Sequence, residues 1–177
     1  TNKNTKGAIY IVRDPRDVLV SFAHHFGLNY EETFTQLTSS NSYEYPTSSG
    51  KSYKKTIMGK WSDHYNSWKN YKSCKILIIK YEDMILNEHE TFKKIINYLG
   101  EVNNTEFNEE KFKKALNQSQ FNELQKLEKT EGFLEKGQGE FFFRKGKVGT
   151  WKDEISSNLT DKIEKLFKNE MEELGYL

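Results

Sequence analysis

The feature that most constrains the fold is the stretch from Ala8 to Phe26, where a short apolar run precedes a helical pattern. Residues 8–12 are apolar, mostly β-branched or aromatic, and too few for a helix, so they predict a buried strand. Asp14 is placed to cap the helix that follows, and Pro15 suits a first turn, where no amide donor is needed. Asp17 adds negative charge near the positive end of the helix dipole.

A turn from strand to helix is also a place where an anion can bind. The backbone N–H groups at the start of a helix point toward such an anion. Arg13, at the end of the strand, can hold a phosphate through two parallel hydrogen bonds. The alternative interpretation is an ordinary capped helix with Arg13 in a surface ion pair, and these residues alone leave both interpretations open.

The length and composition predict a single folded domain over residues 1–177. Aromatic residues make up 14% and hydrophobic residues 35%, which excludes disorder although 30% of the residues are charged. Lys plus Arg (27) nearly balances Asp plus Glu (26), so we expect no nucleic-acid or membrane-surface partner. Basic charge is local: residues 51–60 and 141–152 contain Lys and Arg but no acid. These patches and the aromatics are the only support for nucleic-acid binding.

The single cysteine, Cys74, allows no internal disulfide and no cysteine-based metal cluster. This suits a reducing compartment, so we expect a cytoplasmic protein. We also expect no metal site. No apolar run has the length of a membrane span, and the first residues do not read as a signal peptide. Residues 1–6 are polar, lack an initiator Met and lead directly into a buried strand. We therefore expect the chain to be the later part of a larger protein.

Periodicity predicts an α/β fold. The apolar run Lys75–Lys80 predicts a second strand, parallel to the first because a helical crossover separates them. We expect loops over Thr38–Ser52 and Thr130–Thr150 and a helix stop at Gly100. The spacing of apolar residues predicts further helices over Tyr30–Leu37, Tyr53–Tyr71, Glu88–Leu99, Asn108–Asn117, Ser119–Lys129 (with the stripe Phe121, Leu124, Leu127) and a C-terminal segment with the stripe Leu159, Ile163, Leu166, Phe167, Met171 and Leu174.

The sequence RKGKVGTWK, Arg144 to Lys152, is a second candidate anion site. Gly146 and Gly149 permit backbone conformations in which successive N–H groups converge on an anion. Arg144 and Lys145 bring positive charge to the same place. The spacing GxxxxGK[ST] of a Walker A loop is absent from the sequence. The phosphate-binding loop that a kinase of this type requires is therefore missing from these residues.

The chain resembles the carboxy-terminal two thirds of the cytosolic-type sulfotransferases, enzymes that use 3′-phosphoadenosine 5′-phosphosulfate (PAPS). The resemblance implies an α/β, three-layer fold like that of P-loop NTPases, with a partial parallel sheet flanked by helices. Four blocks match in the order found in the family: IVRDPRDVLVSFAHH (11–25), GKWSDHYNSW (59–68), LIIKYEDM (77–84) and FRKGKVGTWK (143–152).

The resemblance also implies which residues bind the nucleotide. Ser21 otherwise reads as an ordinary helix residue, and core packing is the alternative for Tyr81 and Phe121. The implied ligands are Arg13, Ser21, Arg144, Lys145 and Gly146 at the 3′-phosphate, with Phe142 and Phe143 directly before them, and Tyr81, Ser119 and Phe121 at the adenine.

The function implied is transfer of a sulfuryl group from PAPS to a hydroxyl or amine of a small-molecule acceptor, leaving the product nucleotide PAP. In the family the phosphosulfate-binding loop and the catalytic His and Lys precede the matching part, so we expect no catalytic residue here, and His24 and His25 are interpreted as structural. The acceptor and the oligomeric state do not follow from these residues. The alternative is a non-catalytic module that binds 3′-phosphoadenosine nucleotides or a protein partner.

Overall fold

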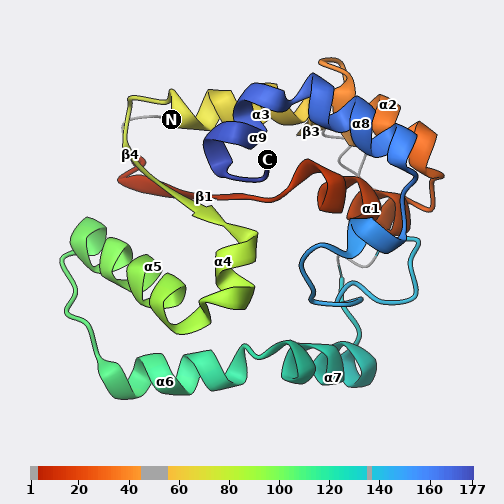
Figure 1. Ribbon diagram of the computed structural model, residues 1–177. Helices are drawn as coiled ribbons and strands as arrows, with labels where there is room; N and C mark the ends of the chain where they lie inside the picture. Colours follow the sequence, from red (N-terminus) through yellow and green to blue (C-terminus); the bar gives the residue numbers. More distant parts are fainter. Residues whose placement is uncertain (1–3, 45–55, 135–136) are drawn as a thin grey trace. The chain divides into compact units, whose positions relative to one another are not determined.

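The strand and the helix expected at the start of the chain both form. The computed structural model describes residues 4–44, 56–134 and 137–177; in it β1 spans Gly7–Val12 and α1 spans Pro15–Phe26 (Figure 1). Asp14 caps α1, because its side chain accepts the backbone N–H of Arg16 at 2.9 Å. The capping and the proline in the first turn are therefore confirmed.

The other elements alternate short strands with helices. A 3-10 helix, η2, interrupts the series near the C-terminus. In chain order the elements are α2 (Tyr30–Thr38), β2 (Tyr43–Glu44), β3 (Thr56–Ile57), α3 (Trp61–Lys69), β4 (Lys75–Lys80), α4 (Tyr81–Leu86), α5 (Glu88–Asn103), α6 (Glu109–Gln118), α7 (Phe121–Glu131), η2 (Thr150–Asp153), α8 (Ser157–Leu166) and α9 (Lys168–Leu174).

The chain folds into two compact units. The first consists of Thr1–Arg13, Trp68–Leu134 and Phe141–Val148, and the second consists of Asp14–Ser67, Glu135–Glu140 and Gly149–Leu177. That the two units form one domain stays a prediction.

The first unit is built on the parallel pair of β1 and β4. Their register sets Gly7 opposite Lys75 and Val12 opposite Lys80, which confirms the predicted α/β arrangement. Helix α5 packs on β4, and the buried Tyr98 on α5 donates its hydroxyl to the Lys75 carbonyl at 2.6 Å. A sheet strand of this kind needs an apolar cover, which the aromatic body of Tyr98 helps to supply.

The second unit has its core around α1, which packs against α2, α8 and η2. Leu19 and Val20 of α1 and Ile163 of α8 are completely buried. Phe167, at the junction of α8 and α9, is also buried, and its ring centroid lies 5.1 Å from that of Trp61. Burial of these large apolar side chains stabilises the unit.

A buried arginine joins α1 to the C-terminal helices. The guanidinium of Arg16 pairs with Asp14, binds Glu164 at 2.5 Å and donates to the Tyr176 carbonyl at 2.9 Å. The guanidinium carbon of Arg16 lies 4.1 Å from the centroid of the Trp151 ring. Burial lowers the pKa of Arg16, but the hydrogen bonds and charges of the two carboxylates outweigh burial and the pKa is raised. The guanidinium therefore stays charged, and its hydrogen bonds connect α1 to α8 and to Tyr176, which follows α9.

Asp17 does more than face the helix dipole. Its carboxylate, only 1% exposed, accepts the backbone N–H of Gly149 at 2.7 Å and that of Trp151 at 3.1 Å. The Thr150 hydroxyl donates to the same carboxylate at 3.1 Å. Three donors compensate the burial of the negative charge, so Asp17 fixes η2 to α1.

The long helix predicted over Tyr53–Tyr71 is wrong in its first part. Residues 53–55 lie outside the described residues, and Thr56 and Ile57 form a strand in which Ile57 is 71% exposed. Gly59 has φ +67°, a left-handed conformation that cannot continue a right-handed helix. The helix therefore begins only at Trp61.

Other boundaries also differ from the prediction. Helix α5 runs through Gly100 and ends where Asn104 adopts φ +54°. The helix predicted from Ser119 begins only at Phe121. Ser119 ends α6, and its hydroxyl donates to the Leu116 carbonyl at 3.1 Å. The predicted C-terminal helix breaks at Phe167, which leaves Leu166 exposed.

The two predicted loops are only partly described. The first contains Tyr43–Glu44 of β2, and its residues 45–52 lie outside the described residues. In the second, α7 extends to Glu131 and η2 begins at Thr150; the described residues between them form no helix or strand. No helix within the described ranges has both the length and the apolar character that a bilayer crossing requires.

Replacing Asp17 by Asn is expected to lower the free energy of unfolding by about 2 to 4 kcal/mol, because three donors lose their charged acceptor. Urea denaturation measures the change. Asp161→Asn, an exposed carboxylate on α8, is the control and is expected to have little effect. Equal unfolding free energies for the two variants contradict the assigned role of Asp17.

Tyr65 makes the stability depend on alkaline pH. Burial, followed by the hydrogen bond to Glu173 at 3.1 Å, raises its pKa to about 12. An unfolded tyrosine has a pKa of about 10, so the stabilisation is complete below about pH 10 and is lost as the pH rises toward 12. Urea titrations at several pH values measure the free energy of unfolding. We expect this free energy to fall less between pH 10 and 12 in Tyr65→Phe than in the wild type. The same pH dependence in both proteins contradicts the role of Tyr65.

Candidate functional site

The parallel pairing of β1 and β4 brings two predicted site residues together. Val12 lies opposite Lys80, so Arg13 and Tyr81 follow the two strands at the same edge of the sheet. The guanidinium carbon of Arg13 lies 4.3 Å from the centroid of the Tyr81 ring. A stacked cation and ring at this distance attract each other, which orients both side chains.

The loop before η2 reaches the same edge. The Arg13 guanidinium donates to the backbone carbonyl of Lys147 at 3.4 Å. Arg144, three residues earlier, is half-buried, and the Lys145 side chain is exposed. The structure thus places this cationic loop beside Arg13. That both segments bind one anion stays a prediction.

Phe121, the first residue of α7, packs against Gly146. A Cβ atom on Gly146 would approach Phe121 Cδ2 to 2.3 Å, and Gly146 has φ +57°. Both observations explain the glycine: no larger residue fits against the ring in that conformation. Gly146 thus adopts a left-handed conformation that glycine permits, and the convergence of its N–H on an anion stays a prediction.

The predicted phenylalanines form one aromatic cluster. The rings of Phe121 and Phe143 lie edge to face with centroids 6.4 Å apart, and those of Phe142 and Phe143 are 5.3 Å apart. Phe133 joins the cluster at 4.6 Å from Phe142. Phe121 is only half-buried, so part of the cluster remains accessible to a flat apolar group.

Ser119 and Ser21 are two further predicted ligands. Ser119 is exposed, and its hydroxyl bonds within α6. Ser21 is half-buried on α1 and belongs to the second unit. Their roles at the nucleotide stay predictions.

Part of the predicted Gly-rich anion loop is used by the protein itself. The N–H groups of Gly149 and Trp151 are directed at the carboxylate of Asp17 and not at an external anion. His24, which we interpret as structural, lies 3.0 Å from Glu154, whose carboxylate also accepts the Tyr30 hydroxyl.

Sequence reasoning missed two contacts from α7 to the loop. Gln125 and Glu128 both bind backbone groups of the loop. The signal was present in the spacing: together with Phe121 they follow at steps of four and three, which places them on one helix face. The apolar stripe that we expected instead fails at Leu127, which is 48% exposed.

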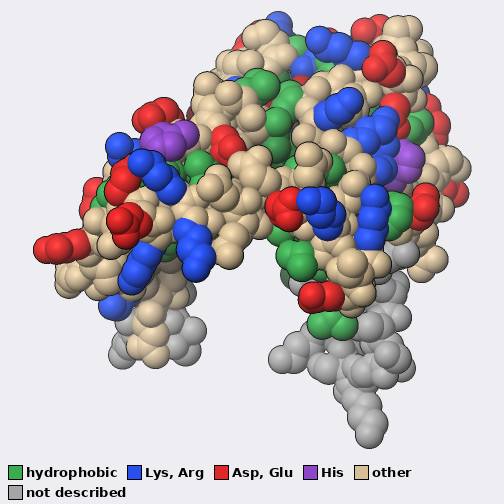
Figure 2. Space-filling model, turned by 90° about the horizontal axis from the view of Figure 1, so that it is seen from below, with side chains coloured by type: hydrophobic (Ala, Val, Ile, Leu, Met, Phe, Trp, Pro, Cys, Tyr) green, Lys and Arg blue, Asp and Glu red, His purple; other side chains and the backbone are tan. Residues whose placement is uncertain are grey.

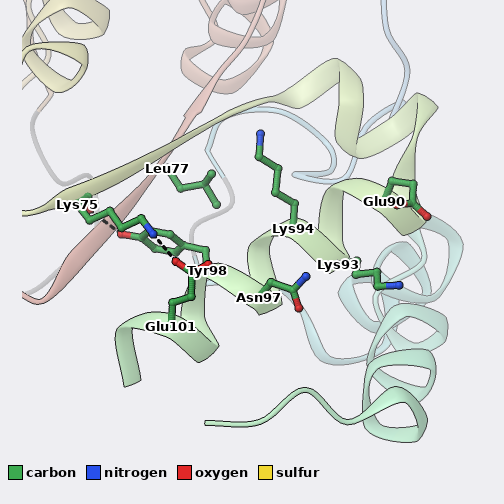
Figure 3. A pocket seen from close by; sticks show the side chains of 8 residues that line it. All are labelled: Lys75, Leu77, Glu90, Lys93, Lys94, Asn97, Tyr98 and Glu101. Carbon is green, nitrogen blue, oxygen red and sulfur yellow. Dashed lines mark hydrogen bonds and ion pairs between the residues drawn. The ribbon is translucent and has the colours of Figure 1, made fainter. Parts of the chain in front are cut away.

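A separate hollow lies between β4 and α5 (Figure 3). It has a volume of about 400 Å³, and Lys75 forms an ion pair with Glu101 at its rim. Lys93, Lys94 and Asn97 also line it. None of the predicted nucleotide ligands lines this hollow.

The surface charge is mixed. In the face shown in Figure 2, Lys and Arg side chains are interspersed with Asp and Glu, in keeping with the balanced composition. Within the described residues there is no cluster of three or more His, Cys, Asp or Glu that is suited to a metal ion.

Comparison with known proteins gives one consistent answer. A family model described as "Sulfotransferase domain" matches residues 1–175. An amine sulfotransferase from Oryctolagus cuniculus is 28% identical over 97% of this chain and 56% of its own length. A 3-alpha-hydroxysteroid sulfotransferase from Cavia porcellus is 28% identical over 92% of this chain and 55% of its own length. The chain thus spans about half the length of these curated relatives.

Solved structures show the same fold. Mouse sulfotransferase SULT7A1 complexed with PAP has a TM-score of 0.68 at 24% identity, over 93% of this chain and 58% of that one. Retinol dehydratase in complex with androsterone and the inactive cofactor PAP has a TM-score of 0.53 at 22% identity, over 92% of this chain and 46% of that one. Because the family model covers nearly the whole chain and the fold agrees, the chain belongs to the sulfotransferase family.

Proposed function

We propose that the protein transfers a sulfuryl group from PAPS to a hydroxyl or amine of a small-molecule acceptor, and that this chain holds the 3′-phosphate and the adenine of PAPS. The observation that carries the proposal is the juxtaposition of Arg13, the Tyr81 ring and the loop around Lys147 at the carboxyl edge of the sheet. Ligands of open α/β sheets bind at this edge. The names of the relatives, an amine and a hydroxysteroid sulfotransferase, support a small acceptor.

The 3′-phosphate site consists, in this proposal, of positive charge and backbone donors. Arg13 and Arg144 supply guanidinium groups, which bind phosphate oxygens in pairs of parallel hydrogen bonds. Lys145, the N–H of Gly146 and the Ser21 hydroxyl complete the set. Such charge-assisted bonds distinguish a nucleotide with a 3′-phosphate from one without it.

The adenine site consists of aromatic side chains. Tyr81 is oriented by Arg13, and Phe121 is held under Gly146. Ser119 offers a hydroxyl for the base. Phe143 contacts the Phe121 ring, and Phe142 and Phe143 directly precede the proposed phosphate ligands. Stacking of a base on an aromatic ring is worth about 1 to 3 kcal/mol in nucleic-acid systems, which is comparable to one ionic contact.

These residues place the donor and take no part in bond making. PAPS supplies the sulfuryl group, and an in-line transfer gains most from fixing the donor in position. We expect the catalytic His and Lys to precede the part of the family that this chain matches, as the resemblance implies. The same resemblance to cytosolic-type enzymes supports a cytoplasmic location.

The 3′-phosphate assignment predicts that adenosine 3′,5′-bisphosphate binds the full-length protein much better than 5′-AMP. Arg144→Ala and Lys145→Ala are expected to weaken the bisphosphate by about ten- to a hundredfold and to leave AMP nearly unchanged, because each charge-assisted bond contributes about 1.5 to 3 kcal/mol. Isothermal titration calorimetry measures both ligands.

Lys147→Ala is the matched control for Lys145→Ala. Both lysines are exposed and flank Gly146, but only the backbone of Lys147 takes part in the site, and alanine keeps that backbone. Equal losses in the two lysine variants, or a wild-type protein without preference for the bisphosphate, remove the 3′-phosphate assignment.

The adenine assignment predicts a different pattern for Gly146→Ala. The new Cβ displaces the Phe121 ring, so the affinity for AMP is expected to fall by about tenfold. The affinity for the bisphosphate is expected to fall by at least as much, because Gly146 also belongs to the proposed phosphate site. Gly149→Ala is the control, since Gly149 also has a positive φ, +74°, but has open space around its Cβ position. If Gly149→Ala has the same effect, backbone strain and not the Phe121 contact is responsible.

A further inference from the structure

Glu128 on α7 is a buried acid whose carboxylate is bound entirely by contacts to the loop backbone. Its Oε1 accepts the backbone N–H of Phe142 at 2.6 Å, and its Oε2 accepts that of Phe143 at 2.9 Å. The residue is only 6% exposed. A carboxylate so far from water is tolerated because both oxygens receive a hydrogen bond.

Neighbouring contacts hold the same two residues from other directions. The Gln125 side-chain amide donates to the Phe143 carbonyl at 2.8 Å. The N–H of Arg144 donates to the Phe142 carbonyl at 2.9 Å, which closes a tight turn directly before the cationic residues. The backbone at the entrance to Arg144 is thus fixed by side chains of α7 and by its own turn.

One face of α7 contacts the loop from Phe142 to Gly146. Phe121, Gln125 and Glu128 are four and three residues apart, so their side chains leave the helix on one side. Gly146 meets Phe121, Phe143 meets Gln125, and Phe142 meets Glu128. The loop therefore runs along the helix in the opposite direction.

The charge of Glu128 has the wrong sign for direct anion binding. It contacts the residue that immediately precedes Arg144, where a negative charge weakens the attraction between the loop and a phosphate. Its two hydrogen bonds, in contrast, fix the backbone from which the Arg144 and Lys145 side chains extend. Electrostatics and positioning thus predict effects of opposite sign when the charge is removed.

We propose that Glu128 is a positioning residue, which holds the loop from Phe142 to Gly146 in the conformation that binds the 3′-phosphate. This rests on the proposed function and adds to it a residue that touches neither ligand nor acceptor. The carboxylate contributes by restricting the loop before binding, so the nucleotide does not have to order it.

The test is Glu128→Gln in the full-length protein, with Glu131→Gln as the control. Glu131 is exposed on the same helix, so the control removes the same charge without touching the loop. Calorimetry with adenosine 3′,5′-bisphosphate and 5′-AMP measures binding, and amide hydrogen exchange at Phe142 and Phe143 measures the hold on the loop. Glu128→Asp, which keeps the charge on a shorter side chain, is the second variant.

For Glu128→Gln we expect exchange at both amides to accelerate at least about tenfold and the bisphosphate to bind about tenfold more weakly, with a smaller loss for AMP. Glu128→Asp is expected to show a smaller increase in exchange and a smaller loss of bisphosphate affinity than Glu128→Gln. The control Glu131→Gln is expected to show neither change. Unchanged exchange, or bisphosphate binding that is equal or tighter in Glu128→Gln, overturns the proposal. A wild-type protein that does not prefer the bisphosphate overturns the proposed function instead, and the exchange rates still decide whether Glu128 holds the loop.

Discussion

The first unit depends on the parallel register between β1 and β4. Because Val12 lies opposite Lys80, the residues that follow the two strands are neighbours, although α1 to α3 separate them in the chain. Arg13 and Tyr81 stack for this reason, and the loop around Lys147 joins them through a backbone contact. A register shifted by one residue exposes the opposite face of each strand and separates the two side chains.

Buried carboxylates bind the backbone at both ends of the segment of residues 142–151, which includes Gly146 and Gly149. In the first unit Glu128 accepts two backbone N–H groups at its beginning, and in the second unit Asp17 accepts two more and a hydroxyl near its end. Each acid acts as an internal anion for backbone donors, much as a bound phosphate does at a helix start. Within each unit, the end of the segment that the acid contacts thereby obtains a fixed conformation.

The sequence predicted those parts of the fold that depend on local chemistry. The strand and capped helix around Asp14 and the second strand at Lys75–Lys80 follow from apolar runs and capping residues, and all form. The helix over Tyr53–Tyr71 failed because the aromatic spacing continued past Gly59, whose positive φ the spacing does not reveal. Long-range contacts were out of reach: the spacing of Phe121, Gln125 and Glu128 places these residues on one helix face but does not name their partners. No local pattern shows that Asp17 meets Gly149. The family resemblance named the cationic residues but not the acids that hold them.

Contacts to the backbone do not depend on which side chain the contacted residue carries. Glu128 and Asp17 bind N–H groups, which every residue except proline has, at positions 142, 143, 149 and 151. The aromatic residues of the loop can therefore be exchanged during evolution while its path is kept. In related chains that share this path, the two acids are expected to vary less than the phenylalanines beside them, and proline is expected to be excluded from those four positions.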